Sequence, residues 1–124
     1  MKTYLLLLLA VASLAGCAAT GPVTSGDSLA REQAIQAAVD NPARPAKDRE
    51  KDPDRRPIEV MKFAGVAPGQ KVLDLFSAGG WYAELLAGVV GPTGQVYMQN
   101  PADTRMGAAA ADERLAGDRL RNVV

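Results

Sequence analysis

The sequence contains no histidine, and only one cysteine among its 124 residues. Without histidine, the chain cannot build a Ser-His-Asp or Cys-His relay. A single cysteine excludes an intrachain disulfide and a Cys/His zinc cluster, so we predict no metal site. Aromatic residues make up only 5%, which disfavours base-stacking surfaces. The 14 Lys and Arg residues equal the 14 Asp and Glu residues, so the basic footprint typical of a nucleic-acid partner is missing.

The remaining composition is typical of a small α/β domain that binds a ligand or transfers a chemical group. The length of the chain predicts one domain at most. The N-terminal residues 1–19 are set apart as a targeting segment. Lys2 gives a positive start, and the apolar stretch around Leu5–Leu9 is shorter than the ~20 residues of a membrane-spanning helix. The stretch Leu14-Ala15-Gly16-Cys17 then resembles a bacterial lipobox. The alternatives are an ordinary cleaved signal that contains a cysteine, or an uncleaved anchor.

The lipobox resemblance implies that the Cys17 sulfur carries lipid and that Cys17 becomes the first residue of the mature chain. Several acyl chains on one residue give a stable membrane anchor, whereas a single chain holds only marginally. Ala18 follows the cysteine where an aspartate would favour the inner membrane, so the resemblance implies an outer-membrane lipoprotein that faces the periplasm.

Residues 20–56 are predicted to form a tether, a weak helix and a charged linker. The tether extends to Gly26, and the helix begins at Asp27 or Ser28 and ends near Asp40. The segment Asn41–Pro57 is rich in charge and proline. It fits a solvated linker with short helical turns, and it also fits a basic and acidic lid over a polar ligand.

Residues 57–124 have the pattern of a partial α/β domain. The strand predicted at Lys71–Phe76 is almost continuously apolar, as in a strand that is buried on both faces. The predicted elements in chain order are a helix Pro57–Ala64 ended by Gly65, a strand Lys71–Phe76, a turn Ser77–Gly80, a helix Trp81–Val90, a strand Gln95–Asn100, a helix from Ala102 or Asp103 to Leu120, and the start of a third strand at Asn122–Val124.

A strand, a turn, a helix and a second strand form a βαβ unit, whose two strands must be parallel. Ligands bind such sheets at the carboxyl ends of the strands. Asp74, the turn Ser77–Gly80 and Asn100 all fall at that edge. Asn100 follows Gly80 by about 20 residues, the spacing at which dinucleotide folds place a ribose-binding acid.

The stretch Val66–Leu75, followed by a turn of small residues, resembles motif I of the class I S-adenosylmethionine-dependent methyltransferases. It is most similar to a group of predicted bacterial methyltransferases whose turn reads Asp-Leu-Phe-Ala-Gly-Gly-Gly-Tyr-Tyr. Here the same positions read Asp74-Leu75-Phe76-Ser77-Ala78-Gly79-Gly80-Trp81-Tyr82. The resemblance covers Arg56–Val124, and implies the N-terminal part of a Rossmann-like doubly wound parallel sheet.

The resemblance also implies a cofactor site for S-adenosylmethionine. Asp74 would attract the ammonium at the amino-acid end of the cofactor, and the turn Ser77–Gly80, including Ala78 and Gly79, would let the backbone approach it closely. Asn100 would take the ribose position. The general class has glycine at Phe76 and Ala78, and an acid at Asn100. The catalytic residues and the methyl acceptor are not identified, and Trp81 and Tyr82 either wall the pocket or pack on the sheet.

The predicted sheet is incomplete, because only two full strands precede the end of the sequence. We therefore expect the N-terminal part of a longer enzyme, with weak cofactor binding or none. The lipobox directs the chain outside the cytoplasm, whereas S-adenosylmethionine is made inside. One rival is a non-catalytic envelope lipoprotein that uses the α/β half-domain as an interaction module. A dinucleotide-binding protein is a weaker rival, because the full G-x-G-x-x-G spacing is missing.

Overall fold

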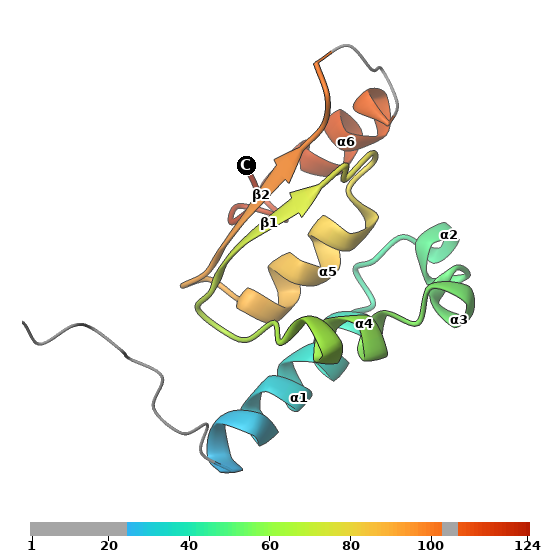
Figure 1. Cartoon of the computed structure of the whole chain (residues 1–124). Coiled ribbons are helices and arrows are strands. Elements are labelled where there is room, and N and C mark those ends of the chain that lie inside the picture. The colour runs from blue at the N-terminus through green and yellow to red at the C-terminus, as the bar shows by residue number, and fades with distance from the viewer. Residues whose placement is uncertain (1–24, 103–106) are drawn as a thin grey trace, which may run out of the picture.

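The computed structural model describes residues 25–102 and 107–124, which form a mixed α/β fold with a two-stranded parallel sheet (Figure 1). The predicted targeting segment 1–19, with Cys17, lies outside these ranges. Among the described helices, none is long and apolar enough to cross a membrane. The elements in chain order are α1 (Ser25–Val39), α2 (Ala46–Arg49), α3 (Asp52–Arg55), α4 (Pro57–Ala64), β1 (Lys71–Leu75), α5 (Trp81–Val90), β2 (Gln95–Gln99) and α6 (Ala108–Leu115).

The parallel arrangement of the two strands confirms the predicted βαβ unit. β1 and β2 pair in register from Lys71 opposite Gln95 to Leu75 opposite Gln99. Val123 forms an isolated parallel bridge to Val96 on the other side of β2, at the position where the start of a third strand was predicted, and the sheet of the described residues has two strands. Parallel strands place their carboxyl ends at one edge, so the segments that follow β1 and β2 lie next to each other.

The core is built around α5, which covers one face of the sheet (Figure 1). Its Leu85 and Val89 side chains are buried and meet Val96 from β2 in the same cluster. Ile35 of α1 and Met61 of α4 are fully buried in that cluster too. The core therefore includes α1, from the predicted tether and linker region, as well as the βαβ unit.

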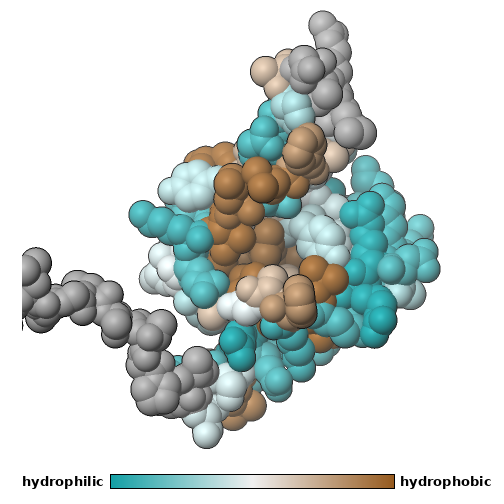
Figure 2. All heavy atoms as spheres, in the orientation of Figure 1, coloured by the Kyte–Doolittle hydropathy of each residue, from teal (hydrophilic) through white to brown (hydrophobic). Residues whose placement is uncertain are grey.

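The outer face of the sheet is open, so the prediction that β1 is buried on both faces is wrong. Side chains alternate along a strand, and those of Leu73 and Leu75 point away from α5 and are 56% and 61% exposed. Tyr97 and Phe76 are also exposed, and the central apolar area in Figure 2 lies over this part of the molecule. Among the described elements, α5 packs on one face and no helix covers the other.

The helix predicted from Ala102 or Asp103 to Leu120 is shorter in the structure. Residues 103–106 lie outside the described ranges, and α6 extends only over Ala108–Leu115. It ends because Ala116 is extended and Gly117 takes a φ of +83°. The segment after it turns back, so that Asn122 and Val123 reach the edge of β2.

Candidate functional site

The turn after β1 has a left-handed backbone at three of its five residues. Phe76, Ala78 and Gly80 have φ values of +55°, +49° and +75°. The turn is tied to the neighbouring strand because the Ser77 N–H donates to the Gln99 carbonyl at 3.1 Å, and the Gly80 N–H closes the turn onto the Ser77 carbonyl at 2.8 Å. Two of these positions, Phe76 and Ala78, are those at which the general methyltransferase motif has glycine.

Ala78→Gly is expected to stabilise the fold by about 1 kcal/mol. The left-handed conformation costs a residue with a Cβ roughly 1–2 kcal/mol, and glycine avoids this cost. Part of the gain is offset because glycine loses more backbone entropy on folding than alanine does. Thermal denaturation followed by circular dichroism measures the change. Ala83→Gly is the control, since Ala83 lies inside α5 and is fully buried, and there glycine should destabilise. A destabilised Ala78→Gly variant would show that the turn is not strained at this residue.

Asn100, which follows β2, is joined to the turn by two hydrogen bonds. Its Oδ1 accepts from the Ala78 N–H at 2.7 Å, and its Nδ2 donates to the Ala78 carbonyl at 3.1 Å. The amide thus pairs with both backbone groups of one turn residue. The structure therefore brings Asn100 and the turn Ser77–Gly80 together, as the sequence predicted. The remaining Nδ2 hydrogen and Oδ1 lone pair are still available for a ligand.

Asp74 lies on the α5 side of β1 rather than in the wall of the cavity described below. Its Oδ2 is buried and has no hydrogen-bond partner among the described residues. Burial raises the pKa of Asp74, against a smaller lowering from the hydrogen bond of the Ala83 N–H. A buried carboxylate oxygen without a donor is unfavourable, and a cationic or hydrogen-bonding group would satisfy it.

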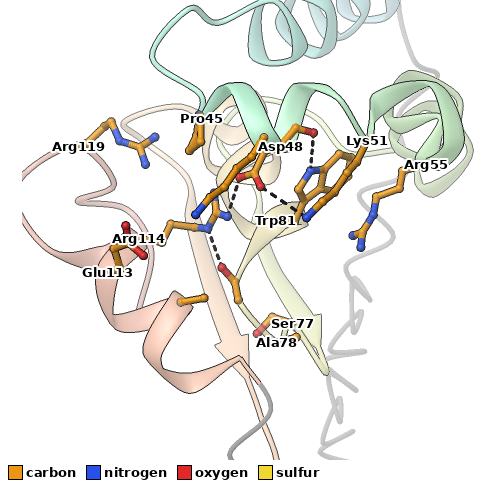
Figure 3. Close-up of a pocket in the computed structure, with 13 residues that line it drawn as sticks. Pro45, Asp48, Lys51, Arg55, Ser77, Ala78, Trp81, Glu113, Arg114 and Arg119 are labelled. Atoms are coloured by element: carbon orange, nitrogen blue, oxygen red, sulfur yellow. Dashed lines mark hydrogen bonds and ion pairs between the residues drawn. The ribbon is translucent and has the colours of Figure 1, made fainter.

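A cavity of about 370 Å³ opens beside the turn, at the carboxyl end of β1 (Figure 3). Its volume is within the range of small-molecule sites, about 300–1,000 Å³. One wall is the turn, a second comes from the α2–α3 segment, and a third comes from α6 and the residues after it. The lining residues are Pro45, Lys47, Asp48, Lys51, Arg55, Ser77, Ala78, Gly79, Trp81, Ala110, Glu113, Arg114 and Arg119.

A buried ion-pair cluster connects the walls of this cavity. Arg114 of α6 donates to Asp48 of α2 at 2.6 Å and to the Gly79 carbonyl of the turn at 2.6 Å, and it also binds Glu84 of α5. Arg119 binds the same Glu84 carboxylate. The side chains of Arg114, Asp48 and Glu84 are all less than 10% exposed. Arg114 therefore holds α2, the turn, α5 and α6 in a fixed arrangement.

Sequence reasoning did not identify this cluster. Glu84 carried one usable signal, because it is a charged residue on the inward side of an otherwise apolar helix, and a buried carboxylate requires a partner. Its partners Arg114 and Arg119 are distant in sequence, and nothing in their local pattern distinguishes them from surface arginines.

The charged segment 41–57 forms two short helices that pack on the site. Arg44, which precedes α2, is buried and makes a bidentate ion pair with Asp52 at 2.8 Å, which fixes the segment before α2 against α3. The Trp81 Nε1–H donates to the Asp48 carbonyl at 3.0 Å, and the Arg55 guanidinium lies 4.8 Å from the Trp81 ring centre. The predicted short helical turns are present, and the segment also forms one wall of the cavity. Trp81 lines that cavity while it is almost fully buried.

The arrangement can bind a small polar molecule between a strained turn, a tryptophan and a cluster of charged side chains. Of the predicted site residues, Ser77, Ala78 and Gly79 line the cavity. Asn100 does not line it and holds the turn through its hydrogen bonds to Ala78. Asp74, on the strand before the turn, has a buried carboxylate oxygen without a partner among the described residues. Comparison of the chain with protein-family models, with curated proteins and with solved structures finds no match.

Proposed function

We propose that the chain is an S-adenosylmethionine-dependent methyltransferase, built on the N-terminal part of a Rossmann-like doubly wound sheet. The observation that carries the proposal is the position of the motif-like turn. It follows the first strand of a parallel βαβ unit, it is hydrogen-bonded to Asn100 after the second strand, and a cavity opens beside it. Ligands of open α/β sheets bind at this edge.

The residues present fit the proposed cofactor. Asp74 does not line the cavity, but its buried Oδ2 is unsatisfied among the described residues, and an ammonium is a group that would satisfy it. The turn has small side chains from Ser77 to Gly80, so backbone N–H and carbonyl groups can approach a ligand. Asn100 keeps one donor and one acceptor for a ribose hydroxyl.

When bound, the cofactor supplies an electrophilic methyl group on a sulfonium. The protein's contribution to such a displacement is chiefly to align the two reacting atoms. The turn is well suited to this role, since Asn100 holds two of its backbone groups and Gln99 and Arg114 each hold another. Alignment of the reacting atoms needs no imidazole, so the absence of histidine from the sequence does not conflict with the proposal. The proposed lipid anchor at Cys17 would place this activity in the cell envelope.

Calorimetric titration of S-adenosylmethionine into the full chain, purified in mild detergent, tests the proposal. We expect weak but saturable binding, and a loss of about tenfold or more in Asp74→Asn, because the neutral amide cannot attract the ammonium. The matched control is Asp54→Asn, since Asp54 is exposed on α3 and outside the cavity. A folded chain that gives no binding heat, or equal affinities for the two variants, would contradict the proposal.

Asp74→Asn should at the same time stabilise the fold near neutral pH. The folded-state pKa of Asp74 is raised above its ordinary value of 3.8. The Asp74 carboxyl group therefore makes its full contribution to the free energy of unfolding below pH 3.8. That contribution is lost as pH rises through the raised pKa and the buried group ionises. Asparagine does not titrate, so the advantage of the variant should grow from pH 4 towards pH 7. Urea denaturation at several pH values measures this dependence, and a pH-independent difference would show that Asp74 is not buried as described.

The non-catalytic interaction module is the second candidate, and the open sheet face favours it. Leu73, Leu75, Phe76 and Tyr97 together expose a large apolar area, and such areas on soluble proteins commonly mark interaction sites. The same titration separates the two candidates, because a folded chain that does not bind S-adenosylmethionine favours the interaction module.

A further inference from the structure

The cavity wall formed by α2 and α3 is cationic. Lys47, Lys51 and Arg55 line it from this side, and Arg114 and Arg119 line it from the side of α6. The only carboxylates among the lining residues are Asp48 and Glu113. Figure 3 shows Lys51 and Arg55 projecting from the α2–α3 segment, with Ser77 and Ala78 on the opposite side of the cavity.

The cations on the two sides differ in how far they are neutralised. Arg114 and Arg119 are paired with the buried Asp48 and Glu84. On the opposite wall, Lys51 has only a long contact of 4.0 Å to Asp48, which Arg114 already binds at 2.6 Å. Within the described part of the chain, neither Lys47 nor Arg55 has a carboxylate within 4.0 Å. The α2–α3 wall therefore has an uncompensated positive charge.

Arg55 is held in place without being neutralised. Its guanidinium lies against the Trp81 ring, an arrangement that restrains the side chain through a cation–π interaction and leaves its N–H donors free for an acceptor. The Tyr82 hydroxyl donates to the Arg55 carbonyl at 3.0 Å and fixes the backbone at the same residue. A restrained guanidinium loses little freedom when it binds an oxyanion, so this wall is preorganised for one.

We propose that this cavity binds the oxyanion group, phosphate or carboxylate, of a small molecule, with Arg55 and Lys51 as its principal ligands and Lys47 and the Ser77 hydroxyl beside them. Taken with the proposed function, on which this step rests, the cationic wall indicates that the methyl acceptor is an anionic molecule. S-adenosylmethionine has two positive centres and one carboxylate, so its net charge favours a place at the turn, on the side of the cavity opposite the cationic α2–α3 wall. An anionic acceptor next to it would be attracted by both the wall and the sulfonium.

Inorganic phosphate, titrated into the full chain without S-adenosylmethionine, tests the site. Trp81 is the only tryptophan in the sequence and lies against Arg55, so its fluorescence reports ligands that bind Arg55. We expect a saturable change with phosphate at constant ionic strength, and none with chloride. Succinate in place of phosphate tests the carboxylate form of the same chemistry. If neither phosphate nor succinate gives a saturable change or a binding heat, the proposal is wrong.

Arg55→Gln should weaken binding of the effective oxyanion about tenfold or more, which is the size expected when one charge-assisted contact is lost. Arg49→Gln is the matched control, because Arg49 is on α2, is exposed, and does not line the cavity, yet the change in net charge is the same. Equal weakening in both variants would reduce the effect to general charge attraction and overturn the proposal. Circular dichroism checks that each variant folds, and Lys51→Gln replaces Arg55→Gln if the latter does not.

The two proposals fail separately. A chain that binds phosphate and not S-adenosylmethionine keeps the oxyanion site and loses the methyltransferase proposal. A chain that binds S-adenosylmethionine and neither oxyanion keeps the methyltransferase proposal and loses this site.

Discussion

Glu84→Gln is expected to destabilise the fold by about 3 kcal/mol, because it leaves Arg114 and Arg119 with Asp48 as the remaining carboxylate of the buried cluster. The glutamine keeps the size of the side chain, so the change isolates the charge. Arg119 is 36% exposed and can turn towards solvent, whereas Arg114 is 9% exposed and stays in place. Most of the loss should therefore come from Arg114. Urea denaturation followed by circular dichroism measures it.

Glu32→Gln is the matched control for this experiment. Glu32 is also a helical glutamate paired with a cation from another helix, Lys62 at 3.2 Å, but both side chains are about half exposed. Exposed pairs of this kind contribute roughly 0–1 kcal/mol. If Glu84→Gln and Glu32→Gln cause similar losses, the buried cluster does not stabilise the walls of the cavity as argued.

Gly107→Ala is expected to destabilise the fold by about 3 kcal/mol, as the combined result of a left-handed backbone and overpacking. Gly107 has a φ of +77°, and a Cβ there would lie 2.9 Å from the Ala78 Cα and closer still to the Ala78 carbonyl carbon and the Gly79 nitrogen. Those atoms belong to the turn, which cannot move without breaking its hydrogen bonds to Asn100. Thermal denaturation measures the loss.

Gly117→Ala separates the two causes. Gly117 has a similar φ of +83°, but nothing lies within 4 Å of the position that its Cβ would take. This variant should lose only the backbone contribution, about 1–2 kcal/mol. The difference between the two variants then measures the close approach of Gly107 to the turn, and equal losses would contradict that approach.

Local pattern was enough to predict the elements that position the site. The helix Trp81–Val90 lies where it was predicted, because glycine precedes and follows an apolar run with helical spacing. The turn Ser77–Gly80 lies where it was predicted, and Val123 pairs with β2 through an isolated bridge. These features depend on neighbouring residues, which a single sequence displays directly.

Long-range features could not be predicted in the same way. β1 has the composition of a strand covered on both faces, but composition does not show which neighbours are present, and Leu73 and Leu75 are exposed. The cavity depends on Asp48, Glu84 and Arg114, which come from three separate helices. The residues next to a charged side chain in the sequence do not show whether that side chain is exposed to solvent or buried in an ion-pair cluster. The sequence therefore could not decide whether the α2–α3 segment is a solvated linker or a wall of the site.

The Arg114 contacts also have a consequence for the order of folding. Asp48 and Glu84 precede Arg114 by 66 and 30 residues, so their neutralisation is a long-range event. Burying the two carboxylates before the arginine arrives is unfavourable. We therefore expect the cavity to close late in folding, when α6 docks, rather than together with the βαβ unit.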